Sequence, residues 1–116
     1  MSDQPCLFCD IISGKRPARK IYEDELATVF EDIAPQAPFH YLVIPNKHIS
    51  SLNEINEENQ MIMAHLLERA VFIARQQGFA DDGYRLVTNC GRKAGQSVFH
   101  LHFHLIAGRH FSWPPG

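Results

Sequence analysis

The sequence lacks long apolar runs. The longest, residues 70–74, has five residues, far below the ~20 that a membrane-spanning helix needs. The first fifteen residues also lack the apolar stretch behind a basic start that marks a secretory signal, and Asp3 and Asp10 interrupt them. We therefore expect neither a membrane partner nor a signal peptide.

Excess positive charge is also missing. Eleven Lys and Arg residues stand against thirteen Asp and Glu residues, for a net charge of −2. Non-specific binding to a nucleic-acid polymer depends on dense positive charge, so we expect no such polymer as a partner. A mononucleotide needs only a few local donors and stays open.

Cysteine is scarce and odd in number. There are three cysteines, two of them in a Cys6-x-x-Cys9 pair. This count favours a reducing, cytoplasmic compartment, with thiols free or bound to metal. With 116 residues, 45% of them hydrophobic, the chain is expected to form one domain, 1–116, with a C-terminal arm at 109–116.

Apolar periodicity and turn residues predict an α+β fold. We expect a short helix after Pro5 that stops at Gly14, and one long helix over 56–77 that Asn56 caps and Gly78 ends. His65 lies off the apolar stripe of this helix and is expected to be solvated. About five antiparallel strands are expected at 20–23, 26–32, 40–44, 84–89 and 98–106.

Three of the seven histidines lie within five residues. Alternate side chains of a strand point to opposite faces, so His100, His102 and His104 should share one face and Phe99, Leu101, Phe103 and Leu105 the other. Three imidazoles on one strand are unlike core packing. Positions i and i+4 of a strand are roughly 13 Å apart, too far to converge on one ion. An extended anion such as a phosphate chain fits this separation better than a single metal ion does. A solvated, histidine-rich strand is the alternative interpretation.

The run 100–106 resembles the His-φ-His-φ-His-φ-φ signature (φ apolar) of the histidine triad, or HIT, superfamily. The resemblance covers nearly the whole chain and points to the Hint branch of nucleoside phosphoramidases. The further segments that carry it are 30–38, 40–45, 47–49, 95–97 and 113–116.

The resemblance implies hydrolysis of the P–N bond in purine nucleoside 5′-phosphoramidates, with no cofactor required for catalysis. His102 would be the nucleophile and form a nucleotidyl-histidine. His100 and His104 would flank it and contact phosphoryl oxygens. Ser97 would contact the leaving nitrogen or a phosphate oxygen, and His40 would support the triad from behind.

The resemblance also implies a substrate-binding set. Asp32 would bind the ribose hydroxyls, and Trp113 would approach the site of a partner subunit. Polar contacts to the phosphate would come from Asn89, Gly95 and Gln96. An apolar slot for the base would consist of Leu7, Phe8, Ile11, Phe30 and Ile33. The residues alone favour plain core for these five, and the resemblance reverses this for Phe30 and Ile33 only. A slot of this kind does not decide between adenine and guanine.

The same resemblance implies a homodimer and a structural metal site. The homodimer would join two sheets into one continuous sheet. The metal site would be a structural zinc ion on Cys6, Cys9, His48 and His100, where two thiolates and two imidazoles would form a tetrahedron. The alternative is a pair of half-buried thiols on the first helix.

Two other functions remain open from sequence. The chain could be a dinucleoside polyphosphate hydrolase of another HIT branch, or a nucleotide- or partner-binding module with incidental hydrolysis. The segments 95–97 and 113–116 favour the phosphoramidase.

Overall fold

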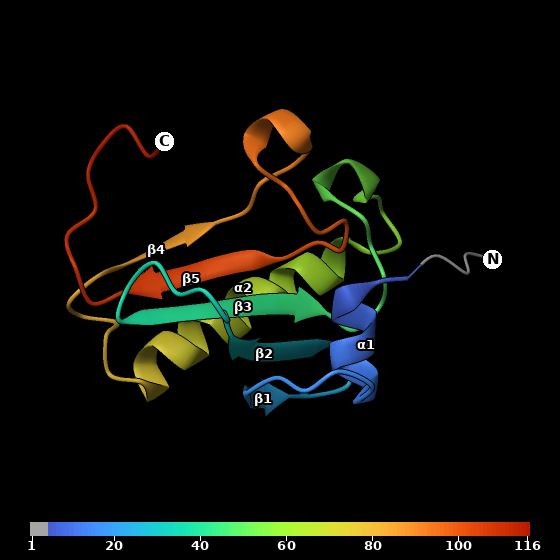
Figure 1. Cartoon of the computed structure of the whole chain (residues 1–116), viewed down its shortest axis with the longest axis horizontal. Helices are drawn as coiled ribbons and strands as arrows, with labels where there is room; N and C mark the ends of the chain where they lie inside the picture. The colour runs from blue at the N-terminus through green and yellow to red at the C-terminus, as the bar shows by residue number, and fades with distance from the viewer. Residues whose placement is uncertain (1–4) are drawn as a thin grey trace.

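The computed structural model describes residues 5–116 (Figure 1). Residues 1–4, among them Asp3, lie outside the described part. Within it, no helix is long and apolar enough to cross a membrane. The elements in chain order are α1 (Leu7–Ser13), β1 (Lys20–Glu23), β2 (Ala27–Glu31), β3 (Phe39–Pro45), η1 (Leu52–Glu54), α2 (Gln60–Gln76), β4 (Tyr84–Val87), η2 (Arg92–Ala94) and β5 (Phe103–Ala107).

The five strands form one antiparallel sheet in the order β1-β2-β3-β5-β4. This confirms the α+β class and the expected strand count. β3 is the central strand and β5 lies between β3 and β4. The register of β3 and β5 places Leu42 opposite His104 and His40 opposite Ile106. The histidine-bearing strand is thus held on both sides.

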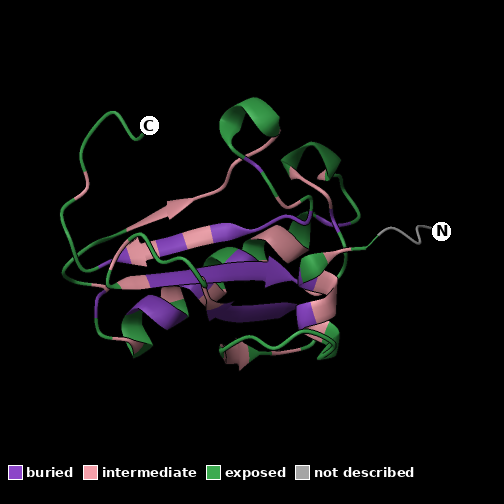
Figure 2. Ribbon diagram, in the orientation of Figure 1, coloured by how far each residue is buried: buried purple, intermediate pink, exposed green. Residues whose placement is uncertain are grey.

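The two long faces of the sheet are covered differently (Figures 1 and 2). Helix α2 lies along one face, where its buried stripe packs with residues such as Val29, Val43 and Leu105. Helix α1 covers only one end of the other face, where Phe8 packs in a smaller cluster with Phe30. The rest of that second face stays open for a site.

The long helix begins later than predicted, at Gln60 rather than at 56. The Asn56 side chain accepts hydrogen bonds from the backbone N–H groups of Glu58 and Asn59. It therefore stabilises a turn before the helix, and Asn59 occupies the N-cap position. Gly78 follows the helix with φ of +85°, as expected of a left-handed residue at this end.

The last strand is shorter than predicted and covers only residues 103–107. Just before it, Leu101 donates its N–H to the carbonyl of Ile49, and the His100 carbonyl lies 2.7 Å from His102 Nδ1. These backbone groups are therefore not in a strand ladder. The alternation survives, because Leu101 and Phe103 are buried in the α2-side core. Phe99 lies before β5 and is 43% exposed, so it is not part of that core.

His65 is not free in solvent, contrary to expectation. Its Nε2 lies 2.7 Å from Asp24 Oδ2 in the turn between β1 and β2. Burial opposes ionisation of Asp24, but hydrogen bonds from Tyr22, His65 and two backbone N–H groups outweigh it and hold its pKa well below the usual range. The pair fastens α2 to this turn, which the helical pattern alone does not reveal.

Candidate active site

His102 is buried at the open face of the sheet, 7% exposed. Its Nδ1 lies 2.7 Å from the carbonyl oxygen of His100. A carbonyl can only accept, so Nδ1 carries the proton and the lone pair of the neutral ring is on Nε2. The ring also stands edge-on to Phe8, with 5.1 Å between centroids. One nitrogen of His102 is thus kept free as a nucleophile.

A chain of hydrogen bonds fixes the two other imidazoles of the site. The backbone N–H of Gln36 donates to His40 Nδ1 at 3.0 Å. Burial lowers the pKa of His40, so the ring is neutral and its proton is on Nε2. That nitrogen lies 2.9 Å from His104 Nδ1, which therefore accepts. Burial and the neighbouring His102 lower the pKa of His104 to about 4, so His104 is neutral and presents an Nε2–H donor.

Asp32 lies beside this pair at the end of β2. Its Oδ2 is 3.3 Å from His40 Nε2 and 4.0 Å from His104 Nδ1, while Oδ1 accepts the N–H of Ala34 at 2.8 Å. The 2.9 Å between the two imidazole nitrogens is a direct hydrogen bond and leaves no room for a cation between them. The carboxylate is oriented, with accepting capacity left for a ligand.

A cavity of about 620 Å³ brings most of the predicted substrate-binding residues together. This size suits a small ligand. Its lining includes nine residues of the predicted set, namely Leu7, Phe8, Ile11, Phe30, Asp32, Ile33, Ser97, His102 and His104.

The predicted base slot is core and cavity wall at once. Phe8, Ile11 and Phe30 are each at most 5% exposed and pack together as a cluster, yet they line the cavity. Leu7 and Ile33 are exposed, Ile33 fully, so they lie at the rim. The slot thus has a buried floor and exposed edges.

Other predicted residues lie elsewhere. Gln96 is buried, and its amide is fully used: Oε1 accepts the N–H of Gly91, while Nε2 donates to the carbonyls of Ser50 and Val98. This side chain closes its own loop and has no donor left for a phosphate. Outside the cavity lining stand Asn89, Gly95, His40, His100 and Trp113, the last 82% exposed.

Sequence reasoning missed several lining residues. Leu42 faces the cavity from β3, and its place could have been read from the alternation of that strand around His40. The others come from the loop after α1 and from the end of β2, where no pattern announces them. They are Arg16, Pro17, Ala18, Arg19 and Glu31.

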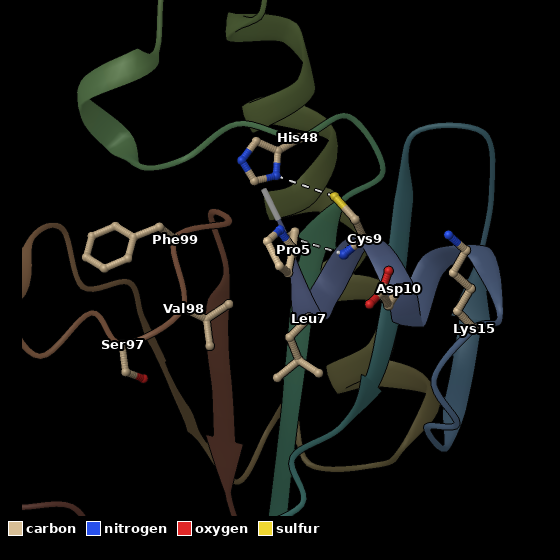
Figure 3. Close-up of a pocket in the computed structure, with 10 residues that line it drawn as sticks. Pro5, Leu7, Cys9, Asp10, Lys15, His48, Ser97, Val98 and Phe99 are labelled. Atoms are coloured by element: carbon tan, nitrogen blue, oxygen red, sulfur yellow. Dashed lines mark hydrogen bonds between the residues drawn. The ribbon is translucent and has the colours of Figure 1, made fainter. Parts of the chain in front are cut away.

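A second cluster joins α1 to the histidine segment. Cys6, Cys9, His48 and His100 each offer a ligand atom, and these atoms all lie within 4.8 Å of one another. Three sulfur-to-Nδ1 distances, from Cys6 to His100 and from Cys9 to His48 and to His100, are 3.4, 3.4 and 3.6 Å. Tetrahedral zinc with bonds of ~2.3 Å to sulfur and ~2.1 Å to nitrogen places its ligands roughly 3.6 Å apart. The four residues therefore fit a zinc ion, and Figure 3 shows His48 directed at Cys9.

The protonation states fit the same ion. His100 Nε2 lies 2.8 Å from the Pro45 carbonyl, so the lone pair is on Nδ1, toward the sulfurs. Burial lowers the pKa of His100 to about 4 and keeps it neutral, as a metal ligand must be. Burial and the adjacent Cys6 raise the pKa of Cys9 to about 11, so a second thiolate beside Cys6 needs a neighbouring cation.

Several known proteins are similar to this chain over most of its length. A family model described as "Scavenger mRNA decapping enzyme C-term binding" matches residues 5–112. An uncharacterised HIT-like protein of Synechococcus elongatus is 48% identical over 110 residues, 95% of this chain and 96% of that protein. The purine nucleoside phosphoramidase of Escherichia coli strain K12 is 44% identical over 103 residues, 89% of this chain and 87% of that protein.

Among solved structures, the chain is similar to the HIT family hydrolase of Legionella pneumophila Philadelphia 1. The TM-score is 0.94 at 46% identity, covering 97% of this chain and 100% of the other. An α+β domain with a histidine-lined cavity and such relatives defines a hydrolase. The chain belongs to the histidine triad (HIT) superfamily.

Proposed function

We propose that the chain hydrolyses the P–N bond of purine nucleoside 5′-phosphoramidates, of the adenosine 5′-monophosphoramidate type, and releases AMP or GMP. The observation that carries this proposal is the tautomer of His102. Its Nδ1–H is bound to the His100 carbonyl, which leaves the Nε2 lone pair free at the cavity that His102 lines.

The reaction has two displacements at phosphorus. His102 Nε2 forms a bond to phosphorus as the P–N bond breaks, and the departing nitrogen takes up a proton from solvent and leaves as an amine. In the second displacement the oxygen of a water molecule bonds to phosphorus as the bond to Nε2 breaks, the water returns a proton to solvent, and the nucleoside monophosphate leaves with the imidazole regenerated. Each step is easier than direct attack of water on the phosphoramidate.

Two neighbours have assigned roles in these steps. His104 is neutral and donates from Nε2, so it can hydrogen-bond a phosphoryl oxygen as charge develops there. Ser97 is an exposed hydroxyl that lines the cavity together with His102, and we assign it to the leaving nitrogen. His40 acts through His104 and does not line the cavity.

The nucleoside would occupy the other end of the cavity. Asp32 can accept from both ribose hydroxyls, because a carboxylate has two accepting oxygens. The base would lie on the floor of Phe8, Ile11 and Phe30, with Ile33 at the rim. The similarity to the Escherichia coli purine nucleoside phosphoramidase supports a purine in this place.

One comparison of substrates tests the proposal. Fluorogenic adenosine and guanosine phosphoramidates and a diadenosine polyphosphate are offered to the wild-type chain and to His102→Asn. We expect turnover of the phosphoramidates by the wild type only. Faster cleavage of the diadenosine polyphosphate would instead indicate a dinucleoside polyphosphate hydrolase. Tight AMP binding with no turnover of any of them would indicate a binding module.

We further propose one structural zinc ion per chain on Cys6, Cys9, His48 and His100. When bound, it would tie α1 to the segment that carries His102 and supply no step of the reaction. Two observations support this assignment: the four ligand atoms lie close together, and His100 Nε2 donates a hydrogen bond to the Pro45 carbonyl.

A homodimer is the third proposal. Among the described strands, β4 pairs with β5 alone, so its other edge is open. An open strand edge is a ready surface for another strand. Trp113, 82% exposed, is a large apolar side chain that a partner subunit could cover.

A further inference from the structure

Both main-chain groups of Gln36 are engaged, in opposite directions. Its N–H donates to His40 Nδ1 at 3.0 Å. Its carbonyl accepts the Nε–H of Arg109 at 2.9 Å. The loop between β2 and β3 is therefore held at one residue between a buried imidazole and an exposed guanidinium.

The Gln36 N–H fixes the tautomer of His40 and, through His40, the tautomer of His104. Since a backbone N–H can only donate, His40 Nδ1 must accept, and the neutral ring carries its proton on Nε2. Nε2 then donates to His104 Nδ1, which leaves the His104 proton on its own Nε2. Without the Gln36 N–H, His40 could protonate Nδ1 instead, and the donor of His104 would no longer be fixed.

Arg109 is itself braced by the C-terminal segment. Its guanidinium lies 4.3 Å from the ring centroid of Phe111, and its NH1 donates to the His110 carbonyl. Arg85 of β4 lies 5.3 Å from the same ring and donates to the Ser112 carbonyl. Residues 109–112 thus fold back onto their own sheet, and Phe111 sits between two guanidinium groups.

The turn after β5, at Gly108, packs against the same loop between β2 and β3 that contains Gln36. Gly108 has φ of +96°, and a Cβ there would meet Pro38 Cβ at 2.8 Å. A side chain at this position would push Pro38 away, so only glycine lets the turn after β5 approach the loop so closely. Two separate contacts, at Pro38 and at Gln36, therefore fix the loop from the C-terminal side.

We propose that Arg109 is a positioning residue for the reaction. It holds the Gln36 main chain so that His40 and His104 each keep the proton on Nε2, with the His104 donor directed to the phosphoryl group. The catalytic consequence rests on the proposed phosphoramidase function, whereas the effect on the tautomers does not depend on it.

Arg109→Ala is the central variant, and Arg85→Ala is its matched control. Both remove one cation from Phe111, but only Arg109 contacts Gln36. The tautomers of His40 and His104 are read from two-bond ¹H–¹⁵N NMR spectra of the ligand-free protein. We expect mixed tautomers in Arg109→Ala and wild-type tautomers in Arg85→Ala, with Arg109→Lys intermediate because an ammonium can still donate to the carbonyl.

Kinetics with a fluorogenic adenosine phosphoramidate form the second arm. We expect kcat of Arg109→Ala to fall about tenfold to a hundredfold with KM little changed, and Arg109→Lys to recover part of the loss. Unchanged tautomers in Arg109→Ala, or an equal loss of kcat in Arg85→Ala, would overturn the proposal. If the wild type turns over no phosphoramidate, the proposed function fails, and the NMR arm still decides whether Arg109 sets the tautomers.

Discussion

The ring of Phe8 stands at 89° to the imidazole of His102, with 5.1 Å between their centroids. Phe8 belongs to α1, and the same ring lies 5.9 Å from His100 and 5.5 Å from Phe30. One aromatic side chain therefore connects the cysteine-bearing helix, the proposed nucleophile and the floor of the cavity. We therefore expect that a change that disorders α1 will also disorder the His102 ring.

His102→Asn tests the covalent mechanism. Asparagine can still donate to the His100 carbonyl but has no nucleophilic nitrogen. We expect turnover of an adenosine phosphoramidate to fall by at least about a thousandfold, while AMP binding by calorimetry stays within a few-fold of the wild type. A variant with a tenth of the wild-type rate would exclude nucleotidyl-histidine formation at this residue.

Cys9→Ser tests the zinc site. Elemental analysis of untagged protein, purified without chelators, should give close to one zinc per chain for the wild type and much less for the variant. Loss of the ion should lower Tm by about 10 °C. Cys90→Ser, at a half-buried cysteine outside the cluster, serves as the control and should change neither quantity. Less than half an equivalent in the wild type would refute the site.

Removal of residues 113–116 tests the role of the C-terminal arm and keeps Phe111 in place. Light scattering at micromolar concentration should give a dimer for the full chain. The shortened chain should keep its fold and change its preference among leaving groups, because Trp113 would no longer reach the partner's site. A monomeric mass for the full chain would rule out the homodimer.

The depressed pKa of His104, about 4, predicts lower stability in acid. Unfolded His104 binds a proton near its ordinary pKa of ~6.5, whereas the folded state resists it until about 4. The free energy of unfolding should therefore decrease as pH falls from ~6.5 to about 4.

Comparison with His104→Asn isolates this contribution. Asparagine keeps an acceptor for His40 but does not titrate. Urea unfolding at several pH values should show a slope smaller by up to about 1.4 kcal/mol per pH unit in this range. His100 is common to both proteins, so its protonation cancels. Equal slopes would show that His104 does not take up the proton.

Much of the fold could be predicted from local patterns. Apolar runs, period-2 alternation and turn residues located the five strands, and the apolar stripe located the long helix, because these patterns reflect burial in the core. The start of α2 and the length of β5 were missed. In both places, hydrogen bonds to the Asn56 side chain and to the His100 carbonyl compete with regular structure, and composition does not reveal such competition.

For the site, the sequence led to the family and to most of the residues that line the cavity, but not to the orientation of the imidazoles. The tautomers of His40, His102 and His104 depend on partners at Gln36 and at the His100 carbonyl, which no motif specifies. Gln96 shows the opposite error. An amide beside glycines is typical of an anion-binding loop, yet here it closes the loop on itself.

His100 contributes to two sites through different parts of one residue. Its imidazole faces Cys6 and Cys9, while its carbonyl accepts a hydrogen bond from His102 Nδ1. A carbonyl is supplied by every amino acid, so a substitution at position 100 would remove a proposed zinc ligand and preserve the acceptor. During evolution, a lineage could therefore exchange the proposed metal for another means of anchoring α1 without first rebuilding the hydrogen bond that orients His102.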